Sequence, residues 1–278
     1  MKRTLLAGMV SALALASAAA ADIKIAHIYG KTGPFEAYAK QSHDGLMLGL
    51  EYATGGTMEP VYARLVAQAR AGRGALDRMT GFNLDEYVGL PPEHSQSYHS
   101  YMRDRLFGPL GLDPSRTHLP RGDAPDPAAE AARFDAAIAQ AGGIDLQLLG
   151  IGGNGHIGFN EPSSSLASPT RVKTLTLATR EANARFFGPE ETVPRFAITM
   201  GIATILRSRH AVLLATGTKK ATAVAAMAEG PLSARCPASA LQLHPRATIV
   251  LDAEAAADLE LRQYYETVHP QGQEVALG

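Results

Sequence analysis

Short apolar segments alternate with longer amphipathic segments along most of the chain, and glycine-rich turns separate them. The apolar and β-branched segments predict strands at 23–29, 79–84, 144–149, 173–177, 196–199, 211–215 and 248–251. Apolar residues at helical spacing predict helices at 59–71, 97–106, 128–141, 180–187, 202–206 and 219–229. Strands and helices that alternate in this way predict an α/β fold with a mostly parallel sheet.

The segment 46–50 (LMLGL) fits two structures. It can extend a helix that begins at residue 35, or it can form a short buried strand ahead of Gly55 and Gly56. Apolar periodicity does not distinguish a strand from a buried helix in so short a run.

The first 21 residues have a different pattern from the rest of the chain. Residues 1–3 are basic after the initial Met, residues 5–16 are apolar, and residues 19–21 are alanines. This order is typical of a secretory signal peptide, with Asp22 as the first mature residue. An N-terminal helix rich in alanine and leucine is the alternative.

Composition narrows the classes of function. Apolar residues make up 46% of the 278 residues and charged residues 19%, which is enough apolar material for a packed core. The 26 basic and 27 acidic residues nearly balance, so composition does not support a general nucleic-acid-binding surface. The single cysteine, Cys236, excludes an intramolecular disulfide and a cysteine-rich metal site. No apolar run of membrane-spanning length follows the N-terminal segment.

Two glycine-containing turns precede predicted helices. They are 54–57 (TGGT), ahead of the helix at 59–71, and Gly217-Thr218, ahead of Lys220. Because a helix N-terminus offers unpaired N–H groups and a partial positive charge, both turns are candidate phosphate sites. Arg185 is a further candidate partner of the phosphate, and Arg171 and Lys173 are candidates for a second anion site. The alternatives are ordinary turns and solvated surface residues.

Two adjacent carboxylates, Asp85 and Glu86, follow the predicted strand at 79–84. A carboxylate at a strand end can act as a general base if partial burial raises its pKa toward neutrality. The local sequence favours another interpretation, in which Asp85 caps a helix and Glu86 is an acid of its first turn.

The segment 150–162 (GIGGNGHIGFNEP) follows an apolar strand and has five glycines in its first nine residues. His156, within it, is of the residue type that transfers protons near pH 7. Glu161 lies within reach around a loop, where it would set the imidazole tautomer and stabilise its charged form. The glycine spacing is not that of a dinucleotide-binding motif. A structural histidine is the alternative.

Together these segments resemble the glucosamine-6-phosphate deaminase family. The resembling runs are ATGGTMEPVYARL, FNLDEYVGLP, LGIGGNGHIGFNEPSSSLASPTRVKTLT, ANARFF, TGTKKA and LQLHP, in family order from about residue 53 to about residue 270. FNLDEYVGLP and GHIGFNEP separate the chain from the related 6-phosphogluconolactonases. The resemblance implies a single-domain, Rossmann-like three-layer α/β sandwich. It also implies conversion of glucosamine 6-phosphate and water to fructose 6-phosphate and ammonium, in amino-sugar catabolism, with no metal or organic cofactor.

The same resemblance implies a role for each candidate residue. Asp85 would move the C2 proton toward C1, and His156 would open the sugar ring with Glu161 as its partner. Asn154 stands where some family members have aspartate, and since an amide cannot share a proton relay we expect it only to orient His156. The residues expected to hold the substrate, chiefly its phosphate, are Thr54, Gly55, Gly56, Thr57, Arg185 and Lys220. The positions that match the activator site of allosteric hexameric members, which binds N-acetylglucosamine 6-phosphate, are Ser164, Arg171 and Lys173.

Residues 1–52 instead resemble the start of a periplasmic amino-acid-type binding protein of ABC importers, in the run IKIAHIYGKTGPFEAYAKQSHDGLMLGLEYATGGT. We therefore expect a signal-peptide-like segment at 1–21, a binding-protein-like βα segment at 22–52 and a deaminase-like domain at 53–278. This arrangement indicates a chimera joined near 46–58, with the strand at 23–29 replacing the family's usual first strand.

Two other functions follow from this arrangement. One is a secreted solute-binding module of an ABC importer, and the other is a folded but catalytically impaired fusion that still binds a sugar phosphate. A deaminase would meet its phosphosugar in the cytoplasm, whereas a working signal peptide would direct the chain to the periplasm. We expect a deaminase to bind a small sugar phosphate and further copies of the chain. We expect the mature chain to bind neither nucleic acid nor a membrane.

Overall fold

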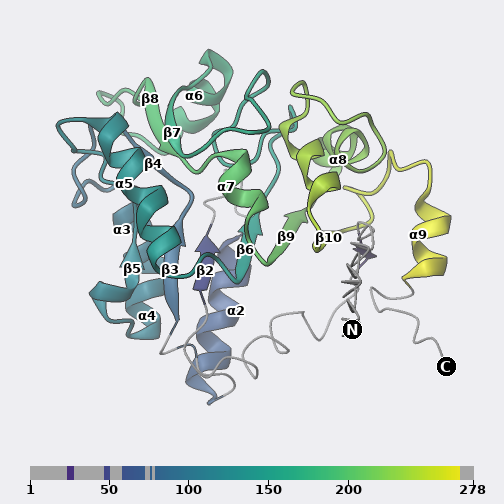
Figure 1. Ribbon diagram of the computed structural model, residues 1–278, viewed down its shortest axis with the longest axis horizontal. Coiled ribbons are helices and arrows are strands. Elements are labelled where there is room, and N and C mark those ends of the chain that lie inside the picture. Colours follow the sequence, from purple (N-terminus) through teal and green to yellow (C-terminus); the bar gives the residue numbers. More distant parts are fainter. Residues whose placement is uncertain (1–23, 28–46, 51–57, 73–75, 77–78, 270–278) are drawn as a thin grey trace, which may run out of the picture.

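A seven-stranded parallel sheet organises the part of the chain that the computed structural model describes, which is residues 24–27, 47–50, 58–72, 76 and 79–269 (Figure 1). Its strands run in the order β1-β10-β9-β6-β2-β3-β5. They are β1 (Lys24–His27), β2 (Met47–Leu50), β3 (Thr80–Asn83), β5 (Thr117–His118), β6 (Leu146–Leu149), β9 (His210–Ala215) and β10 (Ala247–Leu251). Each pairing in this sheet is parallel, which confirms the predicted α/β fold.

Helices cover both faces of this sheet (Figure 1). The helices of the described residues are α2 (Glu59–Arg70), α3 (Tyr98–Met102), α4 (Gly108–Leu110), α5 (Pro127–Gln140), α6 (Leu177–Ala184), α7 (Ile202–Leu206), α8 (Ala221–Ala228) and α9 (Arg262–Val268), of which α6 lies beside β7 and β8 rather than on the main sheet. On one face, Phe134 of α5 and Val224 of α8 share an apolar core with Leu213 of β9. On the other face, Tyr62 of α2 shares a second core with Val212 of β9. Successive residues of one strand thus enter opposite cores, as expected of a three-layer sandwich.

The sequence allows a helix or a strand at 46–50, and within that segment Met47–Leu50 form strand β2. This strand is internal, because it pairs with β3 on one side and with β6 on the other. Strand β1 confirms the strand predicted at 23–29 and forms the edge of the sheet beside β10. The expected signal-peptide segment and the turn at 54–57 lie outside the described residues.

A second, antiparallel sheet of three strands is a feature that the sequence pattern did not indicate. Its order is β4 (Asp85–Tyr87), β8 (Phe196–Thr199) and β7 (Arg171–Thr174). Strand β4 begins only two residues after β3 ends, so this sheet starts at the carboxyl end of the main sheet. The interpretation of Asp85 as a helix cap and Glu86 as a first-turn acid is therefore wrong. Both residues lie in β4, whose partner β8 is distant in the sequence and invisible to local pattern.

Two predicted helices have different bounds in the structure. The helix expected at 97–106 is interrupted, since α3 ends at Met102 and a π-helical turn, Arg103–Phe107, follows it. Helix α6 begins earlier than residue 180, because the Thr176 side chain accepts a hydrogen bond from the Thr179 N–H (3.2 Å) and so caps a helix that starts at Leu177.

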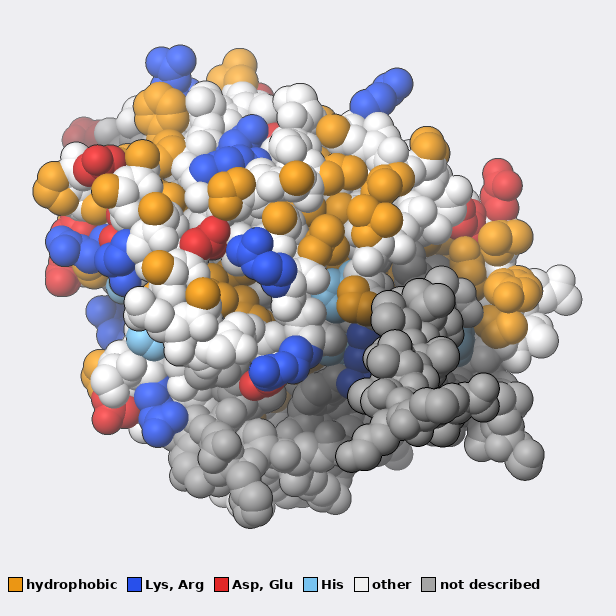
Figure 2. Space-filling model, in the orientation of Figure 1, with side chains coloured by type: hydrophobic (Ala, Val, Ile, Leu, Met, Phe, Trp, Pro, Cys, Tyr) orange, Lys and Arg blue, Asp and Glu red, His pale blue; other side chains and the backbone are white. Residues whose placement is uncertain are grey.

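The described surface is mixed in character. Figure 2 shows Lys and Arg side chains spread among acidic and apolar ones on the face that it draws. Within the described ranges, no helix combines the length and the apolar character needed to cross a bilayer.

Phe134 provides a test of the first core. Its side chain is fully buried on α5 and meets the ring of Phe82 of β3 edge to face, with centroids 6.0 Å apart. We expect Phe134→Ala to lower the free energy of unfolding by about 3–5 kcal/mol, because it leaves a cavity between helix and sheet. Urea denaturation measures this loss. Leu243→Ala, at a side chain 59% exposed, is the control, and an equal effect of the two substitutions would contradict the packing described.

Candidate active site

Asp85 lies where the main sheet passes into the small one, and it is only 2% exposed. The Phe159 N–H donates to its Oδ1 (3.3 Å), and Thr199 of β8 lies directly opposite and donates from its hydroxyl. Burial raises the pKa of Asp85 to about 7; the two hydrogen bonds oppose this shift, and the nearby charge of Glu86 adds to it. A carboxyl group that exchanges its proton near neutrality has the property required of a general base.

Gly158 brings the glycine-rich loop against Asp85. Its φ is +53°, and a Cβ there would lie 3.2 Å from Asp85 Oδ1 and 3.1 Å from Thr199 Oγ1. A side chain at this position would be both strained and crowded. The glycine therefore allows the loop that carries His156 to pass beside the buried carboxylate.

Asn154 joins His156 to Glu161. Its Oδ1 lies 2.6 Å from His156 Nδ1, and its Nδ2 donates to Glu161 Oε2 at 2.8 Å. The His156 Nδ1 atom is 3.7 Å from that same carboxylate oxygen. Since an amide oxygen only accepts hydrogen bonds, this orientation places the proton of a neutral imidazole on Nδ1 and leaves Nε2 free to exchange one.

The imidazole of His156 packs over the backbone of Gly152. A Cβ at Gly152 would lie 2.1 Å from His156 Cε1, so a larger residue would displace the ring. Burial is the main cause that lowers the pKa of His156. The charge of Glu161 acts in the opposite direction, and that of Lys220 lowers the pKa further.

Two threonines at the start of α6 hold the other oxygen of Glu161. Thr179 and Thr176 both donate from their hydroxyls to Oε1, the latter at 3.3 Å. Glu161 is 3% exposed, so these contacts replace solvent around a buried carboxylate. Neither threonine was expected at the site, and the run TLTLAT offers only the helix-capping role of Thr176 as a signal.

The basic residues predicted to bind phosphate are not all placed together. The half-buried Lys220 reaches the loop of His156, where its Nζ donates to the Ile151 carbonyl at 2.6 Å. Arg185 follows α6, is exposed, and lies over the ring of Phe186 at 4.7 Å, a contact that does not join it to that loop. Thr54, Gly55, Gly56 and Thr57 lie outside the described residues.

The residues of the predicted second anion site border the segment that carries Glu161. Arg171 Nη1 donates to Asn160 Oδ1 at 2.9 Å, and the Ser164 N–H donates to the Glu161 carbonyl at 3.0 Å. Burial lowers the pKa of Lys173, and the charge of Arg171 lowers it further, whereas that of Glu161 raises it. The buried Ser164 Oγ and Arg171 Nη2 find no hydrogen-bond partner among the described residues. Over the same residues, no group of three His, Cys, Asp or Glu side chains is placed to hold a metal ion.

The pKa of His156 should respond to its two charged neighbours in opposite directions. We expect Lys220→Gln to raise it, because a nearby positive charge disfavours the imidazolium, and Glu161→Gln to lower it. Titration of the His156 ring protons by NMR measures both changes. Lys219→Gln, at the exposed neighbouring lysine, is the control and should leave the pKa of His156 unchanged. A shift of the same sign in both test variants would contradict the electrostatics described.

Comparison with known proteins identifies the family. A sequence model described as glucosamine-6-phosphate isomerases/6-phosphogluconolactonase matches residues 38–250. The glucosamine-6-phosphate deaminase of Cellvibrio japonicus is 53% identical over 229 residues, which cover 82% of this chain and 86% of that protein. That of Rhodopirellula baltica is 56% identical over 216 residues, covering 78% and 85%.

Solved structures agree with this comparison. A monomeric glucosamine-6-phosphate deaminase has a TM-score of 0.78 and 42% identity, covering 85% of this chain and 100% of that one. The 6-phosphogluconolactonase from Trypanosoma cruzi shares the fold, with a TM-score of 0.62, 18% identity and coverage of 86% and 97%. The chain thus belongs to the glucosamine-6-phosphate deaminase family.

Proposed function

We propose that the chain converts glucosamine 6-phosphate and water to fructose 6-phosphate and ammonium. The observation that carries this proposal is a buried Asp85, with its pKa near 7, beside a loop in which Asn154 joins His156 to Glu161. The high identity to relatives named as deaminases of this substrate supports it.

His156 is proposed to open the sugar ring. In this step the C1–O5 bond breaks, the C1 hydroxyl loses a proton, the ring oxygen gains one, and C1 becomes an aldehyde. Nε2 of His156 is the nitrogen that exchanges this proton, since Asn154 Oδ1 accepts from Nδ1. Glu161 stabilises the imidazolium when it forms.

Asp85 is proposed to carry the C2 proton to C1. As a carboxylate it accepts the proton from C2 while the substrate ammonium gives a proton to O1 of the aldehyde, which yields an enolamine with a C1 hydroxyl. Asp85 then returns its proton to C1, which leaves an iminium at C2. Water then adds to C2 and the amine leaves as ammonium, so that C2 becomes the ketone of fructose 6-phosphate. Every step moves protons and bonding electron pairs, with no net oxidation.

The remaining candidates are proposed to bind anions. Lys220, together with Arg185 and the turn at 54–57, would hold the substrate phosphate, and its contact with the loop of His156 supports this role. Ser164, Arg171 and Lys173 would hold an activating amino-sugar phosphate. The unpartnered Ser164 Oγ and Arg171 Nη2 atoms support that second role.

We also propose that the start of the chain came from another kind of protein. The basic, apolar and alanine-rich order of residues 1–21 supports this. The family match reaches back to residue 38, so the proposal concerns chiefly residues 1–37. Amino-terminal sequencing of the protein from fractionated cells tests whether residues 1–21 act as a signal peptide. A periplasmic chain that starts at Asp22 would support a working signal peptide, and a cytoplasmic chain that keeps Met1 would contradict one.

Removal of either proposed proton carrier should greatly slow turnover. We expect Asp85→Asn and His156→Gln each to lower kcat by a factor of roughly 10² to 10⁴, because each removes a general acid–base group. Coupled assays of ammonium and fructose 6-phosphate measure the loss, and Asp113→Asn, at a carboxylate on the surface, is the control. Folded protein without turnover at millimolar substrate would contradict the proposed function. Calorimetric binding of substrate without turnover would indicate the impaired fusion instead.

The pH dependence should report the ionisation of Asp85. Because the base acts as a carboxylate and its pKa is about 7, we expect kcat/KM to fall tenfold per unit as the pH decreases below about 7. A pH–rate profile between pH 4 and pH 9 measures this limb. An acid limb near pH 4, the ordinary range of an exposed carboxyl, would contradict the assignment of a buried base.

A further inference from the structure

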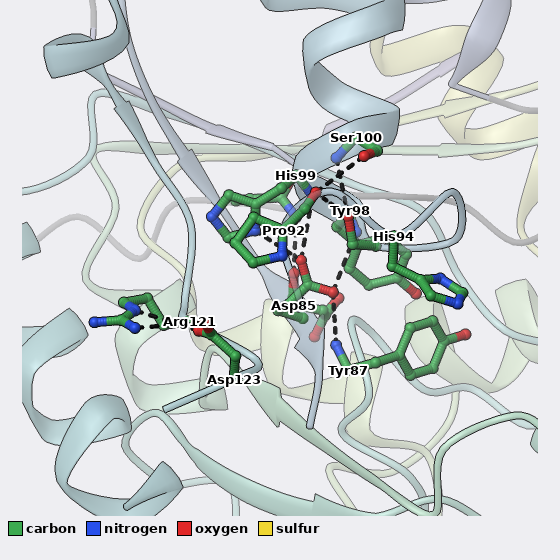
Figure 3. Close-up of polar contacts among 12 residues, drawn as sticks. Asp85, Tyr87, Pro92, His94, Tyr98, His99, Ser100, Arg121 and Asp123 are labelled. Carbon is green, nitrogen blue, oxygen red and sulfur yellow. Dashed lines mark hydrogen bonds and ion pairs between the residues drawn. The ribbon is translucent and has the colours of Figure 1, made fainter. Parts of the chain in front are cut away.

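Glu86 is a fully buried carboxylate that the proposed mechanism does not use. It lies in β4 between Asp85 and Tyr87 and is 0% exposed. Its Oε1 accepts from the N–H groups of Tyr87 (2.8 Å) and Tyr98 (3.1 Å). Its Oε2 accepts from the N–H (3.2 Å) and from Nδ1 (2.8 Å) of His99. Figure 3 labels the three residues that donate, Tyr87, Tyr98 and His99.

These four contacts hold the Glu86 side chain in place. Hydrogen bonds from four donors replace the solvent that burial removes from its two oxygens. Three of the donors belong to Tyr98 and His99, the first two residues of α3, so the carboxylate ties this helix to β4. Because side chains alternate along a strand, Glu86 anchors β4 from the face opposite to Asp85.

Glu86 also acts on Asp85 electrostatically. Its negative charge raises the pKa of Asp85, although by less than burial does. Among the described residues, the other groups that contact Asp85 and shift its pKa are the uncharged Thr199 hydroxyl of β8 and Phe159 N–H of the loop. His99 of α3 is the titratable group that contacts Glu86 from a neighbouring element.

We propose that Glu86, held by His99, is a positioning residue for Asp85. Its hydrogen bonds fix the strand that carries the base, and its negative charge makes the neighbouring carboxylate a stronger base. This inference rests on the proposed function, and it assigns to Glu86 and His99 no contact with the substrate.

Glu86→Gln separates this role from a purely structural one. Loss of the negative neighbour should lower the pKa of Asp85 and so move the acid limb of kcat/KM to lower pH, by about half a pH unit or more. Glu130→Gln is the matched control, since Glu130 is also buried, at 6% exposure, and is held by Arg133 and the Arg121 N–H. We expect Glu130→Gln to lower the melting temperature and to leave the acid limb of kcat/KM at the same pH. An unmoved limb in a folded Glu86→Gln variant would overturn the inference.

Two substitutions of His99 test the same role if Glu86→Gln does not fold. In His99→Asn, the amide nitrogen can take the place of Nδ1 and should preserve kcat. His99→Leu lacks the donor and should lower kcat roughly tenfold or more with little change in KM, because the displaced base acts on the chemical step. Equal kcat values for His99→Leu and the unsubstituted chain would overturn the inference.

The activity of the unsubstituted chain distinguishes failure of this inference from failure of the proposed function on which it rests. If that chain shows no turnover, the proposed function fails and the inference fails with it. If it turns over substrate while the limb and the His99 variants stay unchanged, only the inference fails.

Discussion

The burial of Asp85 is the constraint on which the rest of the site depends. A carboxylate 2% exposed has lost most of its hydration, and two hydrogen bonds, from the Phe159 N–H and the Thr199 hydroxyl, replace only part of it. This incomplete compensation is what brings its pKa to about 7. A carboxylate with more hydrogen bonds, or one less buried, would have a lower pKa and would be a weaker base.

Burial shifts the pKa values of the two proposed proton carriers in opposite directions. It raises the pKa of Asp85 to about 7 and lowers that of His156, because it disfavours the charged form of each group. Asp85 thereby becomes a stronger base than an exposed carboxylate, and His156 favours its neutral form. The glycines at 152 and 158 allow this burial, because they let the loop lie close to both side chains.

The parts of the molecule that the sequence predicted are those that are contiguous in the chain. Except for the two-residue β5, which the sequence did not predict, the strands of the main sheet have their own apolar pattern, and the His156–Glu161 pair lies within a single glycine-rich segment. The small sheet was missed because β4 has three residues and pairs with β8 more than a hundred residues away. Thr199 at Asp85, and Thr179 at Glu161, were missed for the same reason. Nothing in the local sequence of a threonine indicates which distant carboxylate it will contact.

Asn154 shows how a single amide changes the electrostatics of the loop. With Nδ2 toward Glu161 and Oδ1 toward His156, it connects the two groups and adds no charge. An aspartate here would place a second carboxylate against the oxygen that Asn154 Nδ2 now contacts at 2.8 Å, and the two carboxylates would have to share a proton or repel each other. The amide avoids that coupling and leaves Glu161 as the carboxylate that raises the pKa of the imidazole, against burial and Lys220, which lower it. A neutral His156 with a fixed tautomer follows from that balance, and its Nε2 is then ready to accept a proton when the substrate enters.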